Sequence, residues 1–243
     1  MEVFPSDEVN NYINEVIKRE YRVFKTDDEI VDYFNDYMNE LYKRVSFKEM
    51  KDFYLYTGYS FRNINAVFRG NWNYHYNGSK DNISNYKDIC DRIESVFTKL
   101  PPVPGNIKVF RGVDIEPFRE YGINSIKELP NIKGKCIVEE GLTSTSLIES
   151  KCFHNQEIEY HSKCNILIEY YVPEECDDAI ALLTGDLSSA EAQEEVLFAP
   201  SSLVKVVDVK INEDGTEATL KAIYIPVRIW DPNRKPVMDE IIR

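Results

Sequence analysis

The chain lacks the features that mark membrane-spanning, metal-binding and disulfide-stabilised proteins. None of its 243 residues belongs to an apolar run of 18 or more, which excludes a membrane-spanning helix by length. The five cysteines include no Cys-x-x-Cys pair, and no apolar leader follows Met1, so we expect free thiols and no signal peptide. The three histidines lack metal-ligand spacing, so no bound metal is expected.

Basic residues are also too few to balance the acidic ones. The chain has 29 Lys and Arg against 42 Asp and Glu, a net charge of −13. A field of this sign repels nucleic acids and anionic membranes, so neither is an expected partner of the surface as a whole. What is abundant is apolar and aromatic: 43% of the residues are hydrophobic, with 16 Tyr and 12 Phe, which predicts a folded chain with an aromatic core.

The pattern of apolar residues changes near residue 100. Before it, apolar residues recur at helical spacing, and Thr26–Glu29 and Ser46–Glu49 have the form of capping boxes that begin helices. After it come short β-branched or aromatic runs, predicted as strands over 107–113, 136–147, 164–172, 195–199, 203–211 and 219–230. Helices followed by strands indicate an α+β fold.

Three of these strands carry polar residues that a buried strand does not need. Arg111 interrupts an apolar run, and a buried guanidinium requires an anion to face it. Ser144, Thr145 and Ser146 place three hydroxyls in a row, so at least one points inward and needs a hydrogen-bond partner. Glu195 stands where an acidic loop becomes a strand. A buried cluster of Arg111, Ser144 and Glu195 would satisfy all three.

The motifs around these residues resemble the arginine-serine-glutamate class of mono-ADP-ribosyltransferases. VFRG supplies the arginine, LTSTSL the Ser-Thr-Ser strand, QEEVLFAP the Gln-x-Glu, and LYTGYSFRNINAVFRG (55–70) is similar to an upstream helix of the family. The resemblance covers roughly residues 50–210 and is strongest to Rho-modifying exoenzymes and to the catalytic domains of binary actin-modifying toxins. It implies the ADP-ribosyltransferase fold, with N-terminal helices packed on a core of two antiparallel or mixed β-sheets. We expect one domain, 1–243, with a helical extension (1–46) and a catalytic core (47–230).

The resemblance implies that NAD is the co-substrate and that ADP-ribose passes to a macromolecule. Glu195 matches the catalytic glutamate, Arg111 the arginine that clamps a phosphate or ribose oxygen, and Ser144 the serine that orients Glu195. A register shifted by one residue would make Glu194 catalytic instead, and a solvated loop carboxylate is the simpler interpretation of Glu191 and Glu194. The remaining positions that match NAD-contacting residues of the family are Tyr56, Phe61, Asn65, Arg62 and Phe153. Core packing would explain Tyr56 and Phe61 nearly as well, and an exposed salt bridge would explain Arg62 or Arg69.

Gln193, two residues before Glu195, indicates which kind of acceptor receives the ADP-ribose. Arginine-modifying relatives resemble Glu-x-Glu, whereas a carboxamide is no base but both donates and accepts hydrogen bonds, so Gln193 favours a non-arginine protein acceptor. The loop before it, 185–190, lacks the aromatic of Rho-modifying relatives, so Rho is not singled out. A nucleobase acceptor and a catalytically silent binding module are the alternatives. A toxin or effector acting in the cytoplasm, or delivered to the cytosol of a target cell, fits the resemblance, and an inhibitor or antitoxin protein is a conceivable partner.

Overall fold

The computed structural model describes residues 7–70, 80–154, 163–183, 187–189 and 194–230. Its α-helices are α1 (Asp7–Val16), α2 (Asp27–Arg44), α3 (Phe47–Leu55), α4 (Phe61–Phe68), α5 (Lys80–Phe97) and α6 (Val227–Trp230). Its short helical turns are η1 (Tyr56–Ser60), η3 (Glu116–Tyr121), η4 (Ile126–Ile132) and η5 (Glu149–Lys151). Its strands are β1 (Ile107–Val113), β2 (Cys136–Glu139), β3 (Thr143–Ser146), β4 (Ile166–Val172), β5 (Ala179–Leu182), β6 (Glu195–Phe198), β7 (Ser202–Ile211) and β8 (Ala218–Ile225).

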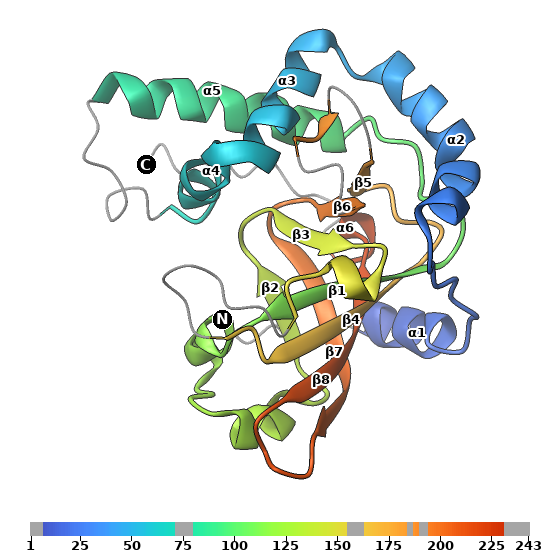
Figure 1. Ribbon diagram of the computed structural model, residues 1–243, viewed down its shortest axis with the longest axis vertical. Coiled ribbons are helices and arrows are strands. Elements are labelled where there is room, and N and C mark those ends of the chain that lie inside the picture. Colours follow the sequence, from blue (N-terminus) through green and yellow to red (C-terminus); the bar gives the residue numbers. More distant parts are fainter. Residues whose placement is uncertain (1–6, 71–79, 155–162, 184–186, 190–193, 231–243) are drawn as a thin grey trace.

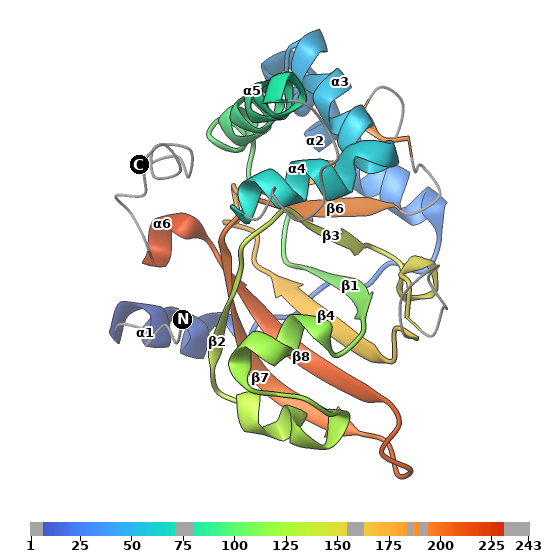
Figure 2. The same ribbon diagram turned by 90° about the vertical axis from the view of Figure 1, so that its left-hand side faces the viewer.

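The α+β class is confirmed, and helices α2 to α5 form a layer beside the strands (Figure 1). The eight strands are hydrogen-bonded in one mixed series, β2-β7-β8-β4-β1-β3-β6-β5. Strands β1 and β3 are joined by a single residue pair, Phe110 and Ser146. The sheet therefore has two halves, β2-β7-β8-β4-β1 and β3-β6-β5, whose strands run in clearly different directions (Figure 2). The expected two sheets are therefore two halves of one bent sheet.

Local sequence explains where the helices begin and end. Ser46 and Glu49 form the expected capping box at the start of α3. Thr26 caps α2 as expected, but the Glu29 carboxylate accepts from the backbone N–H of Lys25 instead of that of Thr26. Gly58 has non-helical backbone angles, φ −91° and ψ −125°, and lies at the kink in η1 that separates the direction of α3 from that of α4. Gly70 has φ of 65° and follows α4, as a helix-ending glycine does.

Strand limits differ from the predicted ones in two places. The run 136–147 is divided into β2 and β3 by Glu140, Gly141 and Leu142, so Ser144 lies in a separate strand from Cys136–Glu139. The predicted strand 219–230 ends at Ile225 because Pro226 follows it and α6 begins. Strand β5 was not predicted: its sequence AIAL is half alanine, which has little preference for strands, and only its complete burial between neighbours makes it one.

One large hydrophobic cluster joins the helical layer to the sheet. Ile30, Phe34 and Leu41 of α2 lie in it together with Leu197 and Phe198 of β6. A second, smaller cluster lies under α1, whose Val9, Ile13 and Val16 pack on strand residues Cys136, Leu203, Ile223 and Ile225. In the described part of the chain, no helix has the length and apolarity needed to cross a bilayer.

Candidate active site

The candidate site lies at the joint between the two halves of the sheet. Past the pair Phe110 and Ser146, β1 and β3 separate, and Arg111 and Ser144 face the place where they do so. Strand β6 pairs with β3 on the other side, with Glu195 directly opposite Ser146. The fold thus brings together residues that are 33 and 51 positions apart in the chain.

Arg111 is held by the backbone of β3. Its Nη1 donates to the carbonyl oxygen of Ser144 at 3.2 Å. Burial opposes the charge of the guanidinium, but the Glu139 carboxylate and several further neighbouring groups together outweigh this effect, so the pKa of Arg111 lies above its ordinary value. The side chain therefore stays charged inside the site.

Glu139 is a functional candidate that sequence reasoning missed. Its carboxylate accepts hydrogen bonds from the hydroxyl of Tyr170 at 2.9 Å and from that of Thr143 at 3.4 Å. The sequence predicted that an anion must lie near Arg111. Glu139, an acidic residue within the predicted strand CIVEEGL, was a candidate for that anion. Glu139, itself held by Tyr170, is the neighbouring group that does most to favour the charged form of the guanidinium.

Glu195 is buried, with 3% of its surface exposed. Burial raises the pKa of its carboxyl to about 7, although a hydrogen bond with the Ser144 side chain and the charge of Arg111 both act to lower the pKa. Ser144 therefore has two contacts: its carbonyl accepts from Arg111 and its hydroxyl holds Glu195. Arg111, Ser144 and Glu195 form one cluster, as the sequence predicted.

The neighbouring Glu194 has a different environment. Its φ is 46°, in the left-handed region, and its carbonyl accepts from the backbone N–H of Leu147 at 2.9 Å. Its Oε1 lies 3.7 Å from Nζ of Lys151, which also pairs with Asp27 at 2.5 Å. The two glutamates are thus separated: one carboxylate faces a lysine and the other faces Ser144 and Arg111.

Tyr56 and Asn65 approach the cluster from the helical layer. The Asn65 Oδ1 accepts from the backbone N–H of Leu142 at 2.8 Å, and its Nδ2 donates to the Tyr56 hydroxyl at 3.3 Å. The Tyr56 hydroxyl donates to the carbonyl of Leu142 at 3.3 Å. Burial, and then the charge of Glu195, raise the pKa of Tyr56. This triangle fixes the residue just before β3 and hence the start of the Ser-Thr-Ser strand.

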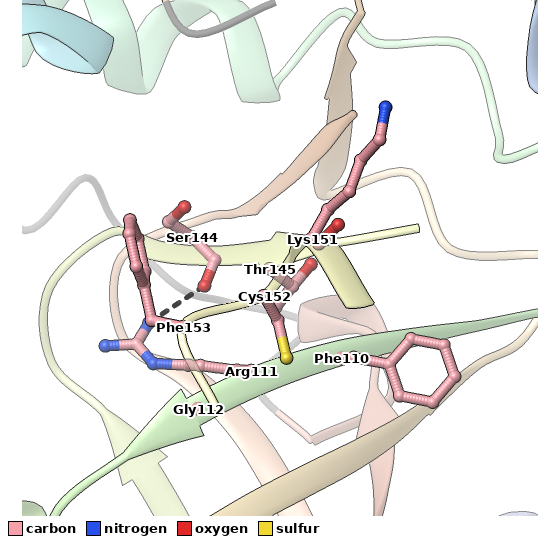
Figure 3. Close-up of a pocket in the computed structure, with 9 residues that line it drawn as sticks. Phe110, Arg111, Gly112, Ser144, Thr145, Lys151, Cys152 and Phe153 are labelled. Carbon is pink, nitrogen blue, oxygen red and sulfur yellow. Dashed lines mark hydrogen bonds between the residues drawn. The ribbon is translucent and has the colours of Figure 1, made fainter. Parts of the chain in front are cut away.

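A shallow hollow opens over the cluster (Figure 3). Arg111, Ser144 and Phe153 line it, and Phe153 is 41% exposed. A Cβ on Gly112 would lie 2.1 Å from the backbone nitrogen of His154, so only glycine allows the Phe153 segment to lie against β1. The hollow is far smaller than the roughly 300–1,000 Å³ of small-molecule pockets, so a dinucleotide would extend beyond it. Glu195 does not line the hollow and is reached through Ser144.

Not every expected residue joins the cluster. Phe61 is 44% exposed on the first turn of α4, and the guanidinium of Arg62 lies 5.6 Å from the centre of its ring. Arg69 is exposed at the end of α4, and its Nε would lie 3.1 Å from a Cβ on Gly141, close to Asn65. Gln193 and Glu191 lie outside the described residues. Among the described residues no three His, Cys, Asp or Glu side chains gather as a metal site would require.

Solved structures resemble this arrangement over most of the chain. The Clostridium limosum C3 exoenzyme has a TM-score of 0.62 at 22% identity, covering 85% of this chain and 98% of that one. C3stau2 from S. aureus, solved with NAD, has a TM-score of 0.65 at 18% identity, covering 86% and 100%. The enzymatic component C2-I of the Clostridium botulinum C2-toxin has a TM-score of 0.61 at 18% identity, covering 85% and 50%. Among curated protein sequences there is no match.

A family model supplies the assignment that the structural likeness leaves at the level of the fold. The model described as ADP-ribosyltransferase exoenzyme matches residues 32–225, which include most of α2, all of α3 to α5 and the eight strands of the described part of the chain. The match contains Arg111, Ser144 and Glu195. The chain therefore belongs to the ADP-ribosyltransferase exoenzyme family, a family of NAD-dependent mono-ADP-ribosyltransferases.

Proposed function

We propose that the protein cleaves the nicotinamide–ribose bond of NAD at the Arg111–Ser144–Glu195 cluster and transfers ADP-ribose to a protein side chain other than arginine. The observation that carries the first part is a buried carboxylate held by a serine hydroxyl beside a charged arginine. Such a group supplies negative charge at a fixed place with little water to screen it. The family membership and the NAD-bound relative support NAD as the co-substrate.

Glu195 is the proposed catalytic residue. When nicotinamide leaves, positive charge develops on the ribose, as in glycoside hydrolysis, and a facing carboxylate stabilises it. At about 4 Å and an effective dielectric constant of about 20, one opposite charge contributes roughly 4 kcal/mol, on the order of a thousandfold in rate. Burial raises the free energy of the ionised Glu195 carboxylate, so a cation that forms beside it is strongly stabilised by the pairing of the two charges.

The other residues bind or position. The planar guanidinium of Arg111 presents several N–H donors that suit a phosphate or ribose oxygen, and Glu139 favours its charged form. Ser144 positions Glu195. Phe153 offers an exposed aromatic face at the rim of the hollow, suited to an aromatic base. Tyr56 and Asn65 position the start of β3.

The remaining candidates, Phe61 and Arg62, would contact only the part of NAD that extends beyond the hollow. Both are exposed on the first turn of α4. An exposed guanidinium there suits the pyrophosphate, and an exposed aromatic ring suits a base, so we keep both as binding residues.

The acceptor proposal rests on Gln193. A carboxamide two residues before the catalytic glutamate can hydrogen-bond an amide but cannot take a proton from a guanidinium. The net charge of −13 favours a protein over a nucleic acid acceptor, because a polyanion is repelled by the acidic surface. Action in the cytosol of a target cell is the setting that this chemistry implies.

The function is tested by Glu195→Gln with Glu194→Gln as its matched control. Both changes replace an almost fully buried carboxylate by an amide of the same shape, one residue apart. We expect Glu195→Gln to keep the fold and to lower nicotinamide release from NAD at least a hundredfold, whereas Glu194→Gln keeps release within severalfold of the unaltered protein. Nicotinamide release at the original rate by Glu195→Gln would refute the assignment, and the reverse pattern would transfer it to Glu194.

A further inference from the structure

Helix α3 exposes several apolar residues although it is a surface helix. Its inward face carries Phe53, which is fully buried, and also two acids, Glu49 and Asp52, which are 7% and 4% exposed. Its outward face carries Phe47, Tyr54 and Leu55, which are 58%, 48% and 46% exposed. A surface helix normally turns its apolar residues to the core and its charges to water. The outward apolar residues of α3 therefore call for an explanation other than folding.

The inward acids are fully engaged by the rest of the helical layer. Glu49 accepts from the Ser46 backbone and hydroxyl at 2.7 Å and from Nζ of Lys99 at 2.6 Å. Asp52 accepts two hydrogen bonds from Arg92, at 2.6 and 3.1 Å. These bonds explain why the acids face inward. They also leave the outer surface of α3 without a carboxylate.

The outward surface combines apolar residues with cations. Phe47, Lys48, Lys51, Tyr54 and Leu55, here called the α3 face, fall within an arc of about 120° at 3.6 residues per turn. All five are exposed. Nζ of Lys51 lies 4.5 Å from the centre of the Phe47 ring, and neither lysine is ion-paired with a described residue. A basic and aromatic face is unexpected on a chain with a net charge of −13.

The α3 face ends at the candidate active site. Tyr56, the next residue, lies within electrostatic reach of Glu195 and Arg111. Thr57 then contacts the segment that precedes Glu195 in the chain: its hydroxyl accepts from the backbone N–H of Ser189 at 2.8 Å and lies 3.2 Å from the Ser189 hydroxyl. A macromolecule seated on the α3 face would therefore lie beside the segment that precedes Glu195 in the chain.

We propose that the α3 face docks the acceptor protein through a surface patch of that protein that is apolar at its centre and carries carboxylates. This rests on the proposed function, since it concerns the acceptor of the same site. Exposed apolar residues supply the buried centre of an interface, and the two lysines supply charge complementarity to the acidic groups around it. The complementarity also steers the acceptor toward this basic face of a chain whose net charge is negative.

The test separates docking from chemistry. The variants Tyr54→Ser/Leu55→Ser and Lys48→Glu/Lys51→Glu are compared with two controls that change equally exposed residues elsewhere, Val31→Ser on α2 and Lys127→Glu on η4. Each protein is given NAD labelled in its adenylate phosphate, with and without a eukaryotic cell lysate. Nicotinamide release is measured without lysate, and protease-sensitive and nuclease-sensitive label are measured with it.

We expect both α3 variants to release nicotinamide within about twofold of the unaltered protein and to lose at least tenfold in labelled protein, while the controls retain both activities. Added salt should reduce protein labelling by the unaltered protein more than by Lys48→Glu/Lys51→Glu, because fewer charge contacts remain to be screened. Undiminished protein labelling by the α3 variants overturns the docking proposal. Label removed by nuclease and not by protease overturns it too, in favour of a nucleic acid acceptor. Absence of nicotinamide release by the unaltered protein overturns the proposed function itself.

Discussion

At the scale of single residues, the site depends on a carboxyl group whose surroundings work against its charge. Burial raises the pKa of Glu195 to about 7, and only the Ser144 hydroxyl and the Arg111 guanidinium act in the other direction. The carboxylate is therefore poised, and its ionised fraction changes near neutral pH. A group in this state has much to gain when a cation forms beside it.

The first prediction is a pH dependence set by Glu195. Stabilising the ribose cation requires the carboxylate, so kcat/KM for nicotinamide release should rise with pH and level off above about 7, falling about tenfold per pH unit below it. Ser144→Ala removes a hydrogen bond that lowers the pKa, so its profile should shift to higher pH and its plateau should fall. Initial rates between pH 5 and 9 measure both effects. A profile that is flat over this range would contradict the assigned role.

At the scale of elements, the sequence pattern predicted where most strands lie. It did not predict where the run 136–147 is interrupted or that β5 exists. The predictions for β1, β4 and β6 were confirmed closely because each is a mainly apolar, β-branched or aromatic run bounded by turn residues. Strand β5 was missed, and the run 136–147 was read as one strand, because alanine-rich pairing and the break between β2 and β3 depend on neighbours that are distant in sequence.

The candidate site shows the same limit. Arg111, Ser144 and Glu195 were found because each is a polar residue in an apolar run, an anomaly that is visible locally. Glu139 was not found, although it is the carboxylate with the largest effect on Arg111, because an acidic residue followed by Glu140 and Gly141 also fits an ordinary turn. Asn65 was assigned to NAD contact, yet its amide group holds Leu142 and Tyr56, a long-range role that no local pattern encodes.

The second prediction compares two asparagines of α4. Asn65→Ala leaves the buried N–H of Leu142 without its acceptor, so it should lower the free energy of unfolding by about 1–3 kcal/mol. It should also lower nicotinamide release roughly tenfold or more, because the start of β3 shifts. Asn63, which donates only to the Tyr86 hydroxyl at 3.2 Å, is the control: Asn63→Ala should cost less than about 1 kcal/mol and leave release unchanged. Equal loss of release in both variants would argue against a positioning role for Asn65.

At the scale of the whole molecule, two of the hydrophobic clusters formed by the described residues have different relations to the site. The large cluster connects α2, α4 and α5 to the strands that carry Ser144 and Glu195. The small one lies between α1 and the strands β2, β7 and β8. Burial of charge at Glu195 is tolerated because the large cluster fixes the strands around it. The small cluster contributes stability without touching the reacting groups.

The last prediction follows from this separation. Ile13 is 7% exposed in the small cluster, whereas Ile17, one turn later, is 50% exposed. Ile13→Asp places a carboxylate against Leu203 and its neighbours and should lower the free energy of unfolding by about 2–4 kcal/mol, while Ile17→Asp should stay within about 0.5 kcal/mol of the original. Denaturant titration measures both. Where Ile13→Asp remains folded, its nicotinamide release per folded molecule should equal that of the unaltered protein. A reduced kcat/KM in the folded fraction would show instead that the α1 side of the sheet is coupled to the Arg111–Ser144–Glu195 cluster.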